Sequence, residues 1–522
     1  MHALHFNADD TQFHLDPDEL PHAYEHVSRE WAVAGLSLNR TKTKVWGPKP
    51  DTVLPAGWEK HRIPSMKCLG ADFVEDGITA TPPRHQEALT EIQTAATALE
   101  SFAARLCQLQ DSGLPRQLSQ ALLRYAAVGG PQHILMCRPI GAEEVQAYDA
   151  TLRSAWENVL GIPLTGDRTW ERAKLPLKAG GMAVGSVEQR ASAAFLTSYV
   201  RTLPEVLRRT GLPSGDALRH ADGGLDAQWR EAEADLLAKG VPPSLIPLSE
   251  RGARKSGKQK AIVEAVNKGA HARIALDLTQ SEQALLRSTT GPGASSFLML
   301  PTQQDHHVED SLFRAAVARR LGGRVGANVG FQGTGCALIS RNGRCSSPLD
   351  AAGVHVNNCK CAGHVVRRHD RLVRWLAAWL GDRVESEVLV EQLVGTDQSE
   401  ERLDITFDFA GRRLWIDVAV VSPLTNSLPQ RARRSRIDGA AARDEETHKR
   451  SKYAGLATPF VVETMGRPGD SARGVLGAFA TDNGAGMSAD VSAAWQAVSA
   501  IVQAESAALE LKANGWTPAS WT

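Results

Sequence analysis

The sequence predicts a multidomain α+β protein with a mostly helical middle part and an α/β domain near its C-terminus. At 522 residues the chain is long enough for about three or four domains. Apolar residues recur at helical spacing over residues 86–127, which indicates long amphipathic helices. Residues 403–409 instead alternate between apolar and polar side chains, the period of two that is typical of a half-buried strand.

The overall composition excludes several classes of protein. Apolar residues make up 42% of the chain and charged residues 23%, which excludes a fully disordered chain, a collagen-like chain and a small disulfide scaffold. The 59 Lys and Arg residues balance the 59 Asp and Glu residues, so any nucleic-acid-binding surface must be local. The sequence has no apolar run of about 18 residues and no basic segment followed by an apolar run at its start. We therefore expect neither a membrane span nor a secretory signal.

The first part of the chain is expected to be mainly helical. Short apolar stretches and turn signals mix over residues 1–80, and helical spacing then dominates 81–170 and 171–325, including an Ala-rich helix at 187–200. A basic, apolar-poor stretch at 251–260 is either an exposed linker or the start of a solvated helix.

The last part of the chain has sharper boundaries. Residues 326–364 combine Gly, Asn, Cys and His with little periodicity, so this segment needs a metal or a partner to stay ordered. An amphipathic helix follows at 365–380. Strands are expected at 403–409 and at 414–421, where one acid interrupts an apolar run, and a last helix is expected at 488–512.

Two acidic residues are predicted to face each other across a hairpin. If Ala410-Gly411 is the two-residue turn, facing residues have numbers that sum to 821, and Asp404 lies opposite Asp417. Opposed residues share a face of the sheet, with Cβ atoms about 4.5–5.5 Å apart. Carboxylates this close repel each other and are costly to desolvate, and a divalent cation such as Mg²⁺ relieves both costs. The alternative is a pair of acids that face solvent at a sheet end, as we expect for Asp408.

Four of the seven cysteines fall within 26 residues and lie among histidines. This bunching predicts a metal site rather than disulfides. Three thiolates and one imidazole are a common ligand set for tetrahedral Zn²⁺. Cys361 and His364 are alternative ligands, and a set of buried free cysteines is the alternative to a metal site. The expected ligands are Cys336, Cys345, His355 and Cys359.

Basic runs on either side of these features are candidates for contacts with phosphate groups. Such runs would neutralise phosphates and make binding salt-dependent, or would form the solvated face of a helix. The first run is Arg314, Arg319, Arg320 and Arg324, and the second is Arg431, Arg433, Arg434 and Arg436.

The start of the chain carries an acidic pair, Asp9 and Asp10. A helical stretch follows, then Gly-Leu-Ser-Leu-Asn-Arg-Thr-Lys at residues 35–42, which ends in Lys42, and then Leu-Gly at residues 69–70. This order resembles the second half of a reverse-transcriptase palm, where an Asp-Asp hairpin holds metal and the later elements lead to the thumb. Few residues precede Asp9, so the upstream metal-binding acid and the fingers of such a polymerase do not fit. We expect no polymerase activity from this chain alone.

A longer pattern occupies the C-terminal part. An Arg-His-Asp motif at residues 368–370 is followed by a Glu, by Asp404 and Asp417, and by Lys-x-x-Lys-Tyr at residues 449–453. This pattern resembles the restriction-endonuclease-like domain of site-specific non-LTR retrotransposons, within the wider PD-(D/E)xK nucleases. The cysteine-rich segment resembles the zinc knuckle that precedes this domain in the same proteins.

The resemblance implies a catalytic set. Two acids would hold Mg²⁺, a glutamate would support it, and a lysine from a later helix would stabilise the developing charge. Leu403 stands where the pattern has proline, and Ala419 stands where it has lysine. The implied catalytic residues are Asp404, Asp417, Glu387 (or Glu385), Lys449 and, as second choice, Lys452. The implied nucleic-acid contacts are Arg368, Arg431, Arg433, Arg434 and Arg436.

The expected function follows from the resemblance. The chain would be a truncated retrotransposon protein in the nucleus that nicks target DNA and also engages the RNA of its element, with Mg²⁺ and Zn²⁺ as cofactors. The first alternative is a non-catalytic nucleic-acid-binding remnant, which Leu403, Ala419 and Asn7 (in place of the aromatic residue of a polymerase hairpin) favour. The second is an unstable fragment whose half palm leaves sheet edges uncovered. The implied segments are a partial palm (1–80), a helical thumb (81–170), a helical connector (171–325), a zinc knuckle (326–364), an α/β nuclease domain (365–480) and a helical tail (481–522).

Overall fold

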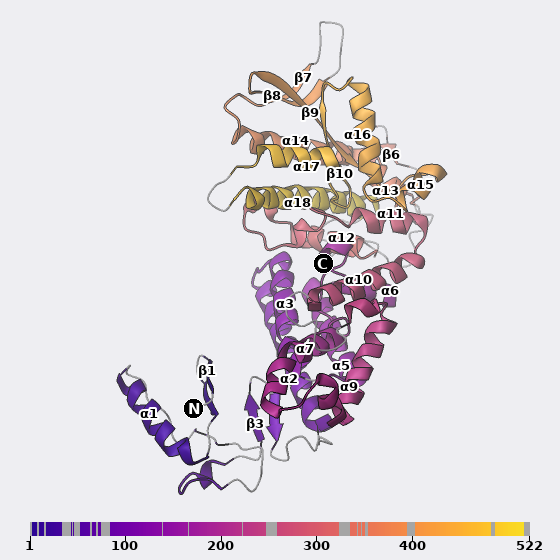
Figure 1. The fold of residues 1–522 in the computed structure, drawn as a ribbon. Coiled ribbons are helices and arrows are strands. Elements are labelled where there is room, and N and C mark those ends of the chain that lie inside the picture. Colours follow the sequence, from indigo (N-terminus) through magenta and orange to yellow (C-terminus); the bar gives the residue numbers. More distant parts are fainter. Residues whose placement is uncertain are drawn as a thin grey trace.

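The computed structural model is a mixed α+β fold that is mostly helical, with small sheets, which confirms the expected class (Figure 1). The structure describes residues 3–7, 10–14, 17–33, 43, 45, 53–62, 65–68, 71–74, 84–137, 139–164, 166–221, 223–246, 258–322, 335–341, 343–345, 347–349, 353–393, 402–481 and 486–515.

The N-terminal elements form two hairpins and one helix. They are β1 (Ala3–Asn7), β2 (Asp10–His14), α1 (Leu20–Val33), β3 (Ser65–Cys68) and β4 (Ala71–Val74). The first hairpin pairs Asn7 with Asp10, so Asp10 begins a strand. Asp9 and Lys42 lie outside the described residues. In Figure 1, α1 and β1 lie apart from the helical body of the molecule.

The helical body contains the segments expected to be thumb and connector. Its helices are α2 (Arg84–Asp111), α3 (Arg116–Gly129), α4 (Gln132–Cys137), α5 (Ala142–Leu160), α6 (Asp167–Lys174), α7 (Ala191–Thr210), α8 (Gly215–Ala221), α9 (Gly223–Ala238), α10 (Lys258–Leu276), α11 (Gln280–Ser288) and α12 (Asp310–Arg320). Trp156 and Phe313 come from the two segments, yet both are fully buried in one core. The expected boundary near residue 170 therefore does not separate two cores. Across the described ranges, no helix combines the length and apolar character needed to cross a membrane.

A four-stranded sheet is the centre of the C-terminal part. Its elements are α14 (His364–Gly381), β7 (Leu389–Leu393), β8 (Arg402–Phe409), β9 (Arg412–Val421), α15 (Leu428–Arg434), α16 (Ala440–Lys452), β10 (Thr458–Glu463), α17 (Asp470–Phe479) and α18 (Met487–Ala513). The strand order is β10-β9-β8-β7, antiparallel except that β10 joins β9 in parallel after the crossover helix α16. Helices α14, α17 and α18 bury one face, and α16 packs against the other (Figure 1).

The hairpin of β8 and β9 has the predicted register. Five consecutive pairs between the strands have residue numbers that sum to 821. Ala410 and Gly411 have φ angles of 50° and 72°, so both turn residues are left-handed, as a tight hairpin that follows the twist of its strands requires. The same register, continued by one residue, places Asp404 opposite Asp417.

Helix α18 is a shared element of several cores rather than a tail. Its boundaries match the expected 488–512 within a residue at each end. Leu511 joins the core of the helical body, Val498 lies beneath the four-stranded sheet, and Leu509 packs on the cysteine-rich segment. One helix therefore connects the three parts of the molecule that surround the candidate sites.

Candidate functional site

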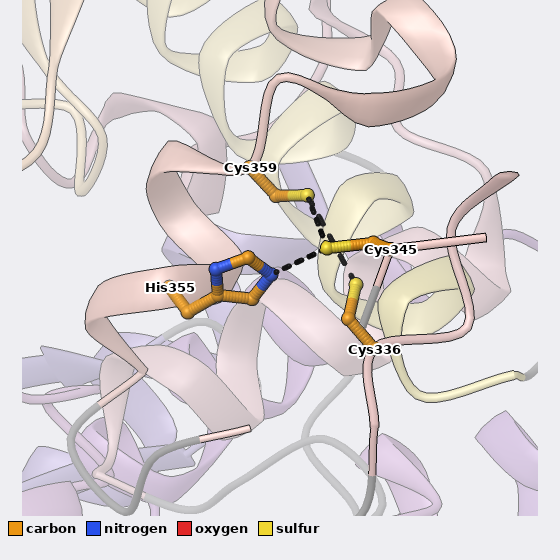
Figure 2. Close-up of side chains that lie close together, drawn as sticks. All are labelled: Cys336, Cys345, His355 and Cys359. Atoms are coloured by element: carbon orange, nitrogen blue, oxygen red, sulfur yellow. Dashed lines mark hydrogen bonds between the residues drawn. The ribbon is translucent and has the colours of Figure 1, made fainter. Parts of the chain in front are cut away.

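The four predicted zinc ligands converge at one place (Figure 2). The local elements are β5 (Ile339–Ser340), β6 (Gly343–Arg344) and α13 (Val354–Asn358). Cys336 and Cys345 lie on either side of the β5–β6 turn, His355 lies in the first turn of α13, and Cys359 directly follows that helix. A turn and a short helix thus bring together residues that are 23 positions apart in the sequence.

Three of the six distances within the cluster match a tetrahedral zinc site, and all four ligand atoms lie within 4.8 Å of one another. The Sγ atoms of Cys336 and Cys345 lie 4.0 Å and 3.9 Å from the Sγ atom of Cys359, and Cys345 Sγ lies 3.5 Å from His355 Nε2. With Zn–S bonds of about 2.3 Å and Zn–N bonds of about 2.0 Å, a regular tetrahedron has edges of about 3.8 Å and about 3.5 Å. The cluster would therefore hold a metal such as zinc with little rearrangement.

Backbone N–H groups point at all three sulfurs. Those of Leu338, Ser347 and Cys361 each donate to the cysteine two residues earlier. Such donors stabilise thiolates and orient them for a metal. The N–H of Ser347 lowers the pKa of Cys345 to about 6, whereas burial raises the pKa of Cys359 to about 12. A bound cation would resolve this difference by favouring the thiolate at every sulfur.

The alternative ligands Cys361 and His364 are not part of the cluster. Cys361 supplies a backbone N–H to it, and His364 is the buried first residue of α14. The cysteine-rich segment is anchored on α18, where the N–H of Ala337 donates to the carbonyl of Ala513 at 2.8 Å. The site therefore joins the end of α18 to the start of α14.

The carboxylates of Asp404 and Asp417 each meet a cation from a different helix. Asp404 Oδ2 lies 3.2 Å from His369 Nε2 of α14 and accepts the N–H of Val418 at 2.6 Å. Asp417 forms an ion pair with Lys449 of α16, and both side chains are largely buried. The sheet thus presents two acids side by side, and the helices on its opposite faces supply one basic group to each.

These contacts shift the pKa values of the two acids in opposite directions. Burial raises the pKa of Asp404, but the hydrogen bond and positive charge of His369, together with the N–H of Val418, outweigh it and hold the pKa below its ordinary value. Burial raises the pKa of Asp417, the neighbouring charge of Asp404 raises it further, and Lys449 only partly compensates. Asp417 is therefore the member of the pair that most needs an additional cation.

His369 is held between two acids. Its Nδ1 lies 3.1 Å from Asp370 and its Nε2 lies 3.2 Å from Asp404, so both ring nitrogens face carboxylate oxygens. Burial lowers the pKa of His369, but these two acids outweigh burial and raise the pKa to about 9. The imidazole therefore carries a positive charge near neutral pH and fixes the orientation of Asp404.

The raised pKa predicts a pH-dependent contribution of His369 to stability. Because the pKa is higher in the folded chain than its ordinary value of 6.5, the stabilisation is complete below about pH 6.5 and is lost as the pH rises through about 9. His369→Asn should lower the free energy of unfolding more near pH 6 than near pH 10, measured by urea unfolding in EDTA. His448→Asn, an exposed histidine in α16, is the control. An effect of His369→Asn that is equal at both pH values would contradict the prediction.

The predicted supporting glutamates are not brought to the acid pair. Ser386, which lies between Glu385 and Glu387, exchanges hydrogen bonds with the backbone of Asp408 near the hairpin turn. Asp408 lies four residues along β8 from Asp404, which is about 13 Å in a strand. Both glutamates therefore lie at the turn end of the sheet rather than beside the pair.

A different glutamate takes the position opposite Asp404. The pairs between β7 and β8 on either side place Glu391 directly across from Asp404, and Glu391 has a φ of 55° in a locally distorted strand. Residues 394–401 separate the two strands, and a connection of this length does not let the sequence set the register. Glu391 is therefore the candidate third carboxylate that sequence reasoning missed.

The second-choice lysine has a partner of its own. Lys452 Nζ donates to the hydroxyl of Tyr453 at 2.8 Å and lies 4.4 Å from the centre of its ring. Tyr453 packs on Leu403 beside the sheet. Lys452 therefore acts on Asp417 only through its charge, whereas Lys449 is in direct contact.

The structure separates the predicted nucleic-acid-binding arginines. Arg368, Arg431 and Arg434 line one cleft of about 1040 Å³ between the cysteine-rich segment and the C-terminal end of β9. Arg433 and Arg434 both pair with Asp444 of α16, and Arg436 lines a different pocket. Arg368 is 2% exposed and donates to Ser506 of α18, so it is a structural residue rather than the predicted nucleic-acid contact. Arg431 and Arg434 are the predicted contacts that remain at the cleft.

The earlier basic run does not form a phosphate-binding surface. Arg320 is 1% exposed and donates to the carbonyls of Leu177 and Thr289, and Arg319 is buried against an acid of α18. These guanidinium groups satisfy backbone and side-chain acceptors inside the protein. Arg324 lies outside the described residues.

Comparisons with known proteins do not assign the chain to a family. No protein-family model matches the sequence, and no curated protein matches it.

Proposed function

We propose that the C-terminal part of this protein is a metal-dependent DNA endonuclease that nicks one strand of its target. The observation that carries the proposal is the facing pair of Asp404 and Asp417 with Lys449 in contact. Paired carboxylates beside a lysine on a sheet surface suit hydrolysis of a phosphodiester, because they can hold a hard cation and stabilise charge on the phosphate.

The acid pair fits a divalent cation. Carboxylate oxygens are the ligands that Mg²⁺ prefers, and Asp417 Oδ2 is buried with the ammonium group of Lys449 against it, so this oxygen already holds a cation. Asp404 and Asp417 would hold the cation, with Glu391 as the third candidate. When bound, Mg²⁺ would activate water and offset negative charge on the phosphate.

The neighbouring residues have separable roles. Lys449 Nζ, next to Asp417, would stabilise the negative charge that develops on the phosphate. His369 Nε2 and the N–H of Val418 hold one oxygen of Asp404, which leaves its second oxygen for other partners. Burial of the pair excludes bulk water, which strengthens each of these interactions.

The wider proposal is that the chain derives from a non-LTR retrotransposon. The supporting observations are a β1–β2 hairpin at the acidic pair of the N-terminus, a cluster with zinc geometry ahead of the sheet, and a cleft lined by Arg431 and Arg434. The proposed partners are target DNA and the RNA of the element, and the proposed location is the nucleus. Polymerase activity is not part of the proposal.

The test is nicking of supercoiled plasmid by the zinc-loaded full chain with and without added Mg²⁺. We expect open-circular DNA to accumulate only when Mg²⁺ is added. Folded, zinc-loaded protein that leaves the plasmid supercoiled under both conditions would overturn the nuclease proposal.

The second candidate function is nucleic-acid binding without cleavage. The observation that favours it is that His369 and Lys449 already neutralise both acids, while Ala419 provides no lysine on the strand itself. Binding of labelled DNA together with the absence of Mg²⁺-dependent nicking would support this candidate.

A further inference from the structure

A second basic hollow lies where the helical body meets the C-terminal domain. It encloses about 460 Å³ between Arg287 of α11 and Pro292 on one side and the starts of α16 and α17 on the other. The lining contains more arginines than acids. Its charged residues are Arg287, Arg436, Arg443, Arg467, Arg473, Asp438 and Asp470.

Two of these arginines are fixed in place by the protein. Arg287 donates from Nε to the carbonyl of Ser435 at 2.7 Å and from Nη1 to Asp438 at 2.6 Å. Arg467 donates from Nη1 to Thr290 Oγ1 at 2.7 Å and lies 3.6 Å from Asp438. Because both guanidinium groups are held in advance, little conformational entropy is lost when they bind an anion.

The lining has positive charge that its own acids do not neutralise. Five arginines face two aspartates, which leaves an excess of three positive charges. Arg473 is paired with Asp470, and Arg443 donates to the carbonyl of Asp438 rather than to its carboxylate. Arginine stays protonated at any physiological pH, so the excess is permanent.

The helix starts contribute shape rather than charge. Gly439 and Gly469 precede α16 and α17, so the wall there is bare backbone. Glu463 and Glu446 already accept N–H groups from the first turns of the two helices. The arginines, rather than the helix dipoles, therefore supply the attraction for an anion.

We propose that this pocket binds a phosphate group. Guanidinium groups pair with phosphate through two parallel hydrogen bonds, and an uncompensated positive lining favours a strongly charged anion. One wall of the pocket begins at Arg436, directly after Arg431 and Arg434 of α15, which line the larger cleft. A phosphate of a nucleic-acid backbone that leaves the cleft and a free polyphosphate are the two sources of this chemistry. The first source rests on the proposed nucleic-acid function, and the second does not.

The test compares two double variants of the zinc-loaded full chain without added Mg²⁺, so that cleavage plays no part. Arg436→Ala/Arg473→Ala removes one exposed arginine and one exposed, ion-paired arginine from the pocket. Arg412→Ala/Arg413→Ala removes a matched pair at the hairpin turn, where Arg413 is paired with an aspartate. The probes are a labelled DNA oligonucleotide, followed by fluorescence anisotropy across a salt series, and pyrophosphate, followed by calorimetry.

If the source is a nucleic-acid backbone, the pocket variant should bind DNA about tenfold more weakly than the control variant. The slope of log affinity against log salt concentration should also become shallower by about the contribution of one phosphate contact. If the source is free polyphosphate, the pocket variant should lose pyrophosphate binding and keep its DNA affinity. Equal binding of both probes by the two variants, each with an unchanged thermal melt, would overturn the proposal. If the pocket variant binds either probe more weakly but the parent protein does not nick plasmid, the nuclease proposal is rejected and the phosphate-site proposal stands.

Discussion

Asp417→Asn is expected to lower the rate of Mg²⁺-dependent plasmid nicking by at least about 100-fold, which corresponds to about 2.7 kcal/mol of transition-state stabilisation. The substitution keeps the shape of the side chain but removes the negative charge that would hold the cation and that balances Lys449. Loss of a cation ligand is expected to cost several kcal/mol of charge stabilisation. The measurement is the initial rate of conversion of supercoiled to open-circular plasmid at saturating Mg²⁺.

Asp408→Asn is the matched control for this prediction. Asp408 lies on the same hairpin and is also ion-paired, but it is exposed and meets Arg413 rather than Lys449. We expect the control to nick at the rate of the parent protein. If Asp417→Asn nicks as fast as the control, the activity comes from another site or from a contaminant.

The hairpin shows what the sequence could predict well. Its alternation of apolar and polar residues and its small turn residues are local signals, and together they determine the register of β8 and β9. Because that register places Asp404 opposite Asp417, the core of the candidate site followed from sequence alone. Local sequence signals also predicted the bounds of α14 and α18 within about one residue at each end.

The remaining parts of the site depend on contacts that no local pattern encodes. His369 reaches Asp404 only because α14 packs across the sheet. The register of β7 puts Glu391 rather than Glu387 across from Asp404, and the length of the connection to β8 hides that register from the sequence. Arg287 and Arg467 are 180 residues apart, so the pocket they share becomes visible only after folding.

The zinc cluster could be predicted from the sequence only in part. Ligand types and their bunching predicted a metal site, but spacing alone left Cys361 and His364 open. The structure selects Cys336, Cys345 and Cys359, each with a backbone N–H from two residues further on. This selection is a matter of turn geometry, which the irregular sequence of the segment does not reveal.

Cys359→Ser is expected to remove bound zinc and to lower the midpoint of thermal unfolding by about 5 °C or more. Structural zinc contributes on the order of 10 kcal/mol to the folding of small zinc modules, and this segment has little apolar core of its own. Its anchor on Leu509 and Ala513 of α18 transmits the loss to the helix that all three parts of the molecule share. The measurements are zinc content by mass spectrometry, expected to fall from about one ion per chain to near zero, and a thermal melt.

Cys361→Ser tests whether the effect comes from the ligand set rather than from any nearby thiol. Its sulfur lies outside the cluster, although its side chain hydrogen-bonds to Cys345, and its backbone N–H donates to Cys359; serine retains a donor of each kind. We therefore expect this variant to keep zinc and the parental melt. If instead Cys361→Ser loses zinc while Cys359→Ser keeps it, the ligand assignment is wrong. A parent protein that contains no zinc and melts identically with and without chelator would establish the cysteines as buried free thiols, and the order of the segment would then rest on its packing against α18 alone.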